Sequence, residues 1–377
     1  MAGYECTDKL NAFGHRVDFL ELTGHIECLE QDYALIKPFR LATVREGIRW
    51  SHVEKSPYQY DWSVVGMMIK KGRALGIQQI WDLCHFGFPD DLTPLHPLFA
   101  RRFASLCIAF VQFYRSLVPE GELIVIPINE VSFLSWLGGD ARGTSPYCTG
   151  MGWEVKYGLM RAYIEGVSVL KEIDPLIRIL TAEPLINVVP PAEADEEAKR
   201  WAEEVHENQF QSVDMLCGKI CPELGGQPDY LDMLGYNFYF NNQWVVGTRQ
   251  FLPWVNLPFD SRWRSLGNLL SEAYNRYRRP FLITETGHSQ EHRPNWVEYI
   301  SKECANLISL RLPLWGVCLY PIIDRPDWDH LTPWHASGMW DATFHLEGPP
   351  GRLLHQPMAE ALLSAQQLVE KAVADHP

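Results

Sequence analysis

Short apolar runs alternate with longer segments of helical period along most of the chain, which is typical of repeated βα units around a parallel sheet. Apolar residues three and four positions apart predict helices over residues 98–117 and 153–173, and a third from the capping region 61–63 to Gly76. Strand-like runs cover residues 2–6, 41–45, 77–83, 123–128, 177–181, 233–236, 281–284 and 315–320. The alternation predicts an α/β protein whose strands close into a (β/α)8 TIM barrel.

The length of the chain fits one such barrel. Its 377 residues, 46% of them hydrophobic, can bury one large core, and a barrel needs about 250 residues or more. Two ordinary domains would also fit, but no internal repeat, low-complexity tract or linker divides the chain. We therefore expect a single domain over residues 1–377. The acidic stretch 193–197 is expected to be the exposed start of a helix.

Net charge narrows the range of partners. The formal charge is −14, and the basic runs are no longer than the pairs at 101–102 and 278–279, which argues against nucleic acid and anionic membranes. No stretch reaches about 18 uninterrupted apolar residues, and the N-terminus lacks the basic and apolar regions of a signal peptide. These features predict a cytoplasmic protein, although a leader removed beforehand would leave the same sequence.

The nine cysteines are scattered singly, many of them within apolar runs, as at Cys107 and Cys318. Such positions favour small buried side chains in a reducing compartment. Cys217 and Cys221 are the most closely spaced pair, but zinc sites more often combine tighter pairs in two clusters. No two histidines lie one or four residues apart at a strand end. We expect neither a metal nor a cofactor.

Two strand-like runs end in glutamates that could share one reaction. Glu130 follows the run 123–128, and Glu285 follows the run 281–284. Residues at the carboxyl ends of barrel strands converge on one face, so their distance in sequence is no obstacle. Hydrolysis of a glycosidic bond needs one carboxyl group to protonate the leaving oxygen and a second to attack or stabilise the anomeric carbon. The pair therefore predicts a glycosidase.

Further polar side chains stand at or just beyond the same strand ends, where core packing does not require them. They are Arg45, His85, Asn129, Asn237, Tyr239 and Tyr320. Any one could be a structural polar group, and Glu285 could form a buried ion pair with Arg45. That pair could itself serve catalysis by keeping the carboxylate ionised. So many polar groups at strand ends are harder to explain by solvation alone.

Segments in a fixed order resemble glycoside hydrolase family 1, the family of β-glucosidases and β-galactosidases, and in particular a shorter bacterial branch of it. The resemblance covers nearly the whole chain, and the matching segments are 44–50 (VREGIRW), 81–87 (WDLCHFG), 128–130 (INE), 234–239 (LGYNFY), 283–287 (ITETG) and 322–328 (IIDRPDW). Each motif alone is weak, but their order is specific. The resemblance implies a barrel of the retaining glycosidase clan, with the active site at the carboxyl ends of the strands.

The same resemblance implies roles for individual residues. Glu285 corresponds to the nucleophile, with Arg45 beside it and Tyr239 hydrogen-bonded to it, and Glu130 corresponds to the acid/base. Contacts to the sugar are implied for a larger set: Glu5, His85, Asn129, Asn237, Tyr320, Asp327 and Trp328. Trp50, Phe86, Tyr320 and Trp328 would offer apolar faces to the sugar ring.

The chain departs from the family at three of the sugar-binding positions. Glu5 stands where the family usually has glutamine, Asp327 replaces glutamate, and Tyr320 replaces tryptophan. The preference for glucose, galactose or fucose therefore does not carry over. The chain is also shorter than typical members, so the loops that shape the outer subsites are reduced and the leaving group stays open.

The sequence thus predicts hydrolysis of a β-glycoside, a small molecule or an oligosaccharide, with retention of configuration. Retention requires carboxyl groups about 5–5.5 Å apart, whereas inversion requires roughly 6.5–9.5 Å. Two alternatives remain open: a sugar-binding barrel without turnover, since fold alone does not guarantee function, and a transglycosylase that shares the first step. The oligomeric state is not predicted.

Overall fold

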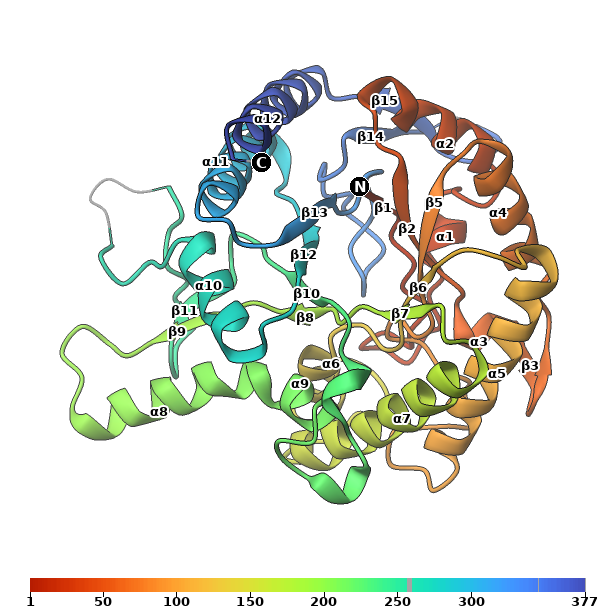
Figure 1. Ribbon diagram of the computed structural model, residues 1–377, viewed down its shortest axis with the longest axis horizontal. Helices are drawn as coiled ribbons and strands as arrows, with labels where there is room; N and C mark the ends of the chain where they lie inside the picture. Colours follow the sequence, from red (N-terminus) through yellow and green to blue (C-terminus); the bar gives the residue numbers. More distant parts are fainter. Residues whose placement is uncertain (256–259, 345, 377) are drawn as a thin grey trace.

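The computed structural model describes residues 1–255, 260–344 and 346–376. A ring of parallel strands forms its centre, and helices surround the ring (Figure 1). In ring order the strands are β7 (Ile177–Ile179), β6 (Leu123–Ile126), β5 (Gln78–Asp82), β2 (Thr43–Gly47), β1 (Ala2–Gly3), β13 (Leu314–Leu319), β12 (Phe281–Thr286), β10 (Leu234–Asn237) and β8 (Glu183–Pro184). This order confirms the predicted α/β barrel.

The ring closes because β7 and β8 belong to one stretch of chain. β7 pairs with β6, while β8 pairs with β10, and a bridge between Leu180 and Met233 joins the two halves. The fifth strand of the barrel is therefore split between its two neighbours. The other predicted strands occur with shifts of a few residues at their ends, and β1 is the shortest of them.

The predicted helices are also present. α4 (Ser63–Ala74), α5 (Phe99–Leu117) and α7 (Gly152–Ile173) match the three predicted ranges, and α8 (Glu196–Glu207) begins in the acidic stretch. The other helices of the described chain are α1 (Phe19–Leu22), α2 (Leu29–Ile36), α3 (Trp50–Val53), α6 (Val131–Gly139), α9 (Gln211–Leu216), α10 (Leu266–Tyr277), α11 (Arg293–Ser309) and α12 (Gln356–Asp375). None of the described helices is long and apolar enough to cross a membrane.

Smaller strand pairs lie outside the ring. β9 (Asn187–Val189) and β11 (Gln243–Val245) pair beside α8, at the lower left of Figure 1. Two hairpins complete the described sheets, β3 (Glu54–Ser56) with β4 (Gln59–Tyr60), and β14 (Trp340–Thr343) with β15 (Gly351–Leu354). All nine cysteines are free, and Cys107 and Cys318 are buried as predicted.

Alternation along the strands divides the barrel into an apolar and a polar layer. Ile80 packs in a cluster with Ile126 and Leu282, whereas Trp81 belongs to the larger core between strands and helices. Because successive side chains point to opposite faces, Ile80 lies inside the ring. Asp82, the next inward position on β5, is buried and charged. The interior is therefore closed by apolar side chains below and lined by polar ones at the carboxyl ends of the strands.

A buried charge network joins the two ends of the chain. His25 lies between two carboxylates, with Nδ1 2.7 Å from Asp32 and Nε2 3.1 Å from Glu46. Tyr33 donates to Glu46 at 2.7 Å, and Arg352 of β15 donates to Asp32 at 2.7 Å. Burial alone would lower the pKa of His25, but the two carboxylates outweigh burial and raise it to about 9.

This network predicts a stability that depends on pH. The folded state holds the His25 proton more tightly than the unfolded chain, where the pKa is near 6.5. The stabilisation is therefore complete below about pH 6.5 and is lost as the pH rises to about 9, by roughly 3 kcal/mol. Urea unfolding between pH 6 and 10 measures the free energy of unfolding. We expect this free energy to fall less steeply with pH in the His25→Gln variant. Equal pH dependence in both proteins would contradict the prediction.

Candidate active site

Glu285 lies inside the barrel mouth with its two oxygens held by different residues. Arg45 donates to Oε1 at 2.7 Å, and the hydroxyl of Tyr239 donates to Oε2 at 2.7 Å. The register between β10 and β12 shifts here, so that Tyr236 faces Ile283 but Asn237 faces Glu285. Such irregularities re-aim side chains at strand ends. The carboxylate is thus oriented by a cation and a hydroxyl at 5% exposure.

Arg45 is the centre of the buried polar layer. Its Nη2 lies 2.7 Å from Asp82 and 2.8 Å from the side-chain oxygen of Asn129, while Nη1 also donates to the carbonyl of Thr284. Asp82 binds the guanidinium through both carboxylate oxygens. Two acceptors on each side leave the guanidinium no freedom to turn, so it presents a fixed positive charge to Glu285.

Glu130 stands between β6 and α6 in the left-handed conformation, with φ of 46°. Its backbone amide donates to the carbonyl of Ala182 at 2.7 Å, and its Oε1 accepts from Asn237 at 2.9 Å. Thr284 donates to the other end of the Asn237 amide, which fixes that amide's orientation. Burial, and after it the charge of Glu285, raises the pKa of Glu130 well above its ordinary value. Glu130 is therefore suited to hold a proton.

His85 occupies the opposite side of Arg45 from Glu285. Its Nδ1 lies 2.6 Å from Asp82, so a proton on Nδ1 is hydrogen-bonded to that carboxylate. Nε2 lies 3.3 Å from the side-chain nitrogen of Asn129 and 3.4 Å from the hydroxyl of Tyr320. The ring of Tyr320 stacks parallel to His85 at 5.9 Å and covers the guanidinium of Arg45 at 5.4 Å.

The carboxylate of Glu5 is surrounded by donors of the protein itself. Thr7 donates its hydroxyl at 2.6 Å and Tyr320 at 3.3 Å to Oε1, whereas Arg325 at 3.0 Å and Trp328 at 3.4 Å approach Oε2. Burial alone would raise the pKa of Glu5, but Arg325, His85 and the donors of Thr7 lower it overall. Glu5 thus gathers Tyr320 and Trp328 at one end of the site, and its oxygens are already engaged.

Asp327 and Trp50 are two further residues for which the sequence predicts a contact with the sugar. The Asp327 carboxylate accepts from the backbone amides of Asp329 and His330, and its described hydrogen bonds join it to no other predicted site residue. Trp50 is fully buried against Phe99 and donates to Glu54, so the prediction that it faces a sugar is wrong. It begins α3 on the outer side of the barrel, where apolar packing decides its position. Phe86, in contrast, contacts Trp328 edge to face at 5.5 Å.

The structure adds polar groups that sequence reasoning did not single out. Asp82 binds both Arg45 and His85, and Thr284 orients Asn237. Arg325 pairs with Glu5, and Glu183 lies beside the start of α6. An aspartate at the end of the apolar run 77–83 was a visible signal for Asp82, because buried charges are rarely tolerated without a partner.

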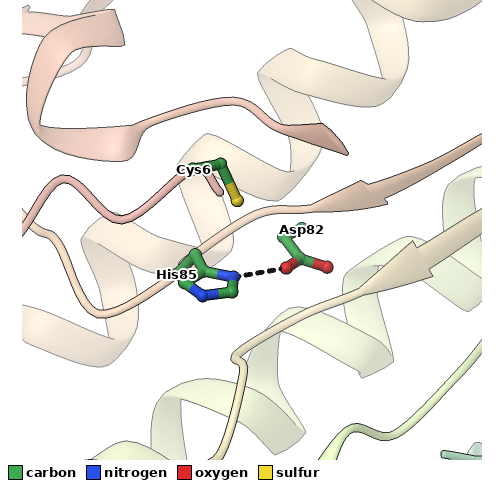
Figure 2. A group of neighbouring side chains, drawn as sticks. All are labelled: Cys6, Asp82 and His85. Carbon is green, nitrogen blue, oxygen red and sulfur yellow. Dashed lines mark hydrogen bonds and ion pairs between the residues drawn. The ribbon is translucent and has the colours of Figure 1, made fainter. Parts of the chain in front are cut away.

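One group in the site has donor atoms close enough for a metal ion. Figure 2 shows Cys6, Asp82 and His85 converging, and their donor atoms lie within 4.8 Å of one another. The guanidinium of Arg45 lies 2.7 Å from Asp82, so a cation already neutralises that carboxylate. Burial also raises the pKa of the Cys6 thiol well above its ordinary value, which disfavours the thiolate that binds metals. The group therefore fits a hydrogen-bonded support for Arg45.

Comparisons with known proteins agree with this fold. No family model matches the sequence, and no curated protein matches it. Among solved structures, β-glucosidase from Thermotoga maritima in complex with deoxynojirimycin has a TM-score of 0.73 at 15% identity, over 91% of this chain and 87% of that one. The monomer of a hyperthermophilic β-glucosidase mutant has a TM-score of 0.72 at 17% identity, over 90% of this chain and 88% of that one.

Fold and site together define an α/β barrel with an acidic pair at the carboxyl ends of its strands. More particularly, the fold is that of the family 1 β-glucosidases, as in the Thermotoga maritima family 1 enzyme with a TM-score of 0.72 at 15% identity, over 91% of this chain and 86% of that one. The resemblance noted in the sequence is confirmed at the level of the fold.

Proposed function

We propose that this chain is a retaining β-glycosidase that acts as one domain over residues 1–377. The observation that carries the proposal is the contrast between its two glutamates. Glu285 is held by a guanidinium and a phenol, whereas the pKa of Glu130 is raised by burial and by Glu285. A carboxyl group that holds its proton, next to one oriented by a cation and a hydroxyl, is the arrangement that acid and nucleophile assignments require.

In the first step, an oxygen of ionised Glu285 attacks the anomeric carbon while the bond to the leaving oxygen breaks. Glu130 gives its proton to that oxygen, so the leaving group departs as an alcohol. In the second step, Glu130 removes a proton from water, whose oxygen attacks the same carbon and displaces Glu285. Two inversions at one carbon give net retention.

The electrostatics of the pair follow the same cycle. While Glu285 is negative, its charge holds the proton on Glu130, as the raised pKa indicates. Formation of the ester removes that charge, and the pKa of Glu130 falls, so it becomes a better base for the second step. Arg45 and Asn237 remain in place throughout, because their other partners hold them.

The substrate of this site is proposed to be a β-glycoside, a small molecule or an oligosaccharide. The structural neighbours were solved with deoxynojirimycin, glucoimidazole and galacto-hydroximolactam, which are sugar-like compounds. The sugar end of this site carries Glu5, Asp327 and Tyr320 at the positions where the sequence departs from the family it resembles, so glucosides, galactosides and fucosides are all candidates.

The test is a panel of chromogenic aryl β-glycosides incubated with the parent chain, with the first-formed sugar followed by proton NMR. Release of the aryl alcohol with the β-anomer appearing first would support the proposal, and the α-anomer first would contradict retention. Absence of turnover by the folded protein on every member would favour the sugar-binding barrel. Products formed with added alcohols would identify transglycosylation.

The hydrogen bond from Tyr239 to Glu285 gives a further prediction. Tyr239→Phe removes one of the two groups that orient the carboxylate, and kcat is expected to fall roughly 10- to 100-fold, because hydrogen bonds to charged groups contribute about 1.5–3 kcal/mol. Initial rates on the best aryl glycoside measure the loss. Tyr277→Phe is the matched control, since its buried hydroxyl also bonds a carboxylate, that of Asp214 at 3.0 Å, outside the site. Equal losses in both variants would contradict a specific role for Tyr239.

A further inference from the structure

A third buried carboxylate, that of Glu183, lies beside Glu130 and belongs to none of the steps above. Glu183 begins β8 at the carboxyl end of the fifth barrel strand and is 2% exposed. Its Oε1 accepts from the backbone amide of Val131 at 2.9 Å, and its Oε2 accepts from that of Ser132 at 3.1 Å. Val131 and Ser132 are the first residues of α6, directly after Glu130.

The first turn of a helix leaves backbone amides without partners, and the N-cap side chain usually accepts from them. Glu130 is the N-cap of α6, but its side chain makes no capping hydrogen bond. Its carboxyl group accepts from Asn237 instead. Glu183 therefore performs from a neighbouring strand the capping that Glu130 would otherwise perform, which leaves the Glu130 side chain free to face the substrate.

We infer that Glu183 is a positioning residue for the acid/base Glu130, and that it acts both by fixing the first turn of α6 and by its negative charge. The inference rests on the proposed function. Because Glu130 is in the left-handed conformation at φ of 46°, its orientation depends on what the residues before and after it are bound to. Ala182 holds it from one side, and Glu183 holds the next residues from the other.

Charged and polar side chains from several elements surround the carboxyl groups of Glu130 and Glu183. Glu130 faces Glu285 on β12, Glu183 on β8, Arg45 on β2, and Asn237 and Tyr239 from β10 onward. Glu183 faces Lys156 and Tyr163 on α7 and Tyr236 on β10. The pKa of Glu183 is raised overall, because burial outweighs the two amides and Lys156, which favour its ionised form. The charge of Glu183 in turn helps to retain the proton on Glu130.

Two variants separate the two effects. Glu183→Gln keeps an oxygen that can accept from one of the two α6 amides but removes the charge, and we expect the alkaline limb of kcat/KM to move to lower pH by roughly half to one unit. Glu183→Asp keeps the charge but is too short to reach both amides, and we expect kcat to fall roughly 10- to 100-fold with the alkaline limb in place. Rates from pH 4 to 9 on an aryl glycoside give both quantities, and thermal unfolding shows whether each variant is folded.

Asp195→Asn is the matched control, because Asp195 caps the exposed helix α8 by accepting from Ala198 at 2.8 Å and lies outside the site. Its pH profile is expected to equal that of the parent. A folded Glu183→Gln with the parent's alkaline limb would overturn the role of the charge. If that variant does not fold, a Glu183→Asp with the parent's kcat would overturn the positioning role. A parent chain that hydrolyses no glycoside would instead refute the proposed function.

Discussion

Replacing Glu285 by glutamine is expected to lower kcat/KM by roughly 10⁵-fold on every glycoside that the parent chain hydrolyses. The amide has nearly the shape of the carboxylate but is neutral, so no covalent intermediate forms. The positive charge of Arg45 would then face an uncharged group on that side, with Asp82 as its remaining ion-pair partner. Release of the aryl alcohol, followed over hours at high enzyme concentration, measures the residual rate.

Glu54→Gln is the control for this substitution, because it changes another buried glutamate that pairs with an arginine. Glu54 accepts from Arg102 at 3.1 Å and from Trp50 at 2.6 Å, outside the barrel mouth. Glu54→Gln is expected to lower the midpoint temperature of thermal unfolding and to leave the hydrolysis rate of the folded protein unchanged. A Glu285→Gln variant with more than about a hundredth of the parent's rate would contradict nucleophilic catalysis by this residue.

The barrel and the positions of its strands could be predicted from the sequence because local patterns decide them. Runs such as 281–284 are too short and too apolar for anything but a buried strand, and the helices between them have clear periods. Glu130 and Glu285 could be found for a related reason. A charged residue directly after a buried strand must lie at the barrel mouth, whatever the details of the packing.

Partners of the buried polar side chains could not be predicted in the same way, because they depend on distances between strands far apart in sequence. Nothing local indicates that Glu183 caps the helix after Glu130, since 51 positions separate it from Ser132. Trp50 belongs to a segment that resembles the family, yet its side chain lies in the core, because it begins α3 and packs against Phe99. The sequence lists Glu5 among the predicted sugar contacts, but nothing local in it indicates that Arg325 and Trp328 engage one of the Glu5 oxygens.

Ion pairs between buried side chains explain how so many charged groups can lie in one barrel mouth. Arg45 is flanked by Asp82 and Glu285, and the Oδ2 atom of Asp82 that contacts Arg45 also contacts His85. Glu130 is the exception, because its one described side-chain hydrogen bond comes from the neutral amide of Asn237. Without a cation in direct contact, burial and the nearby Glu285 dominate, and the pKa rises. The proposed chemistry therefore depends on two features: Arg45 contacts Glu285 directly, and none of the described cations contacts Glu130 in the same way.

The second large effect is therefore expected for Glu130→Gln, and its size should depend on the leaving group. The glutamine oxygen can still accept from Asn237, so the geometry is kept while the acidic proton is lost. Alkyl glycosides, whose leaving alcohols need protonation, are expected to lose roughly 10²- to 10⁴-fold in kcat/KM, whereas dinitrophenyl glycosides should be almost unaffected.

A plot of log kcat/KM against the pKa of the leaving alcohol measures this dependence for the parent and the variant. The variant should show a much steeper slope, because negative charge on the leaving oxygen is no longer neutralised by a proton in the transition state. Its alkaline limb should also disappear, since that limb reports the ionisation of Glu130 in the free enzyme. A uniform loss across all leaving groups, with the parent's slope and alkaline limb, would mean that Glu130 supports the site without donating the proton.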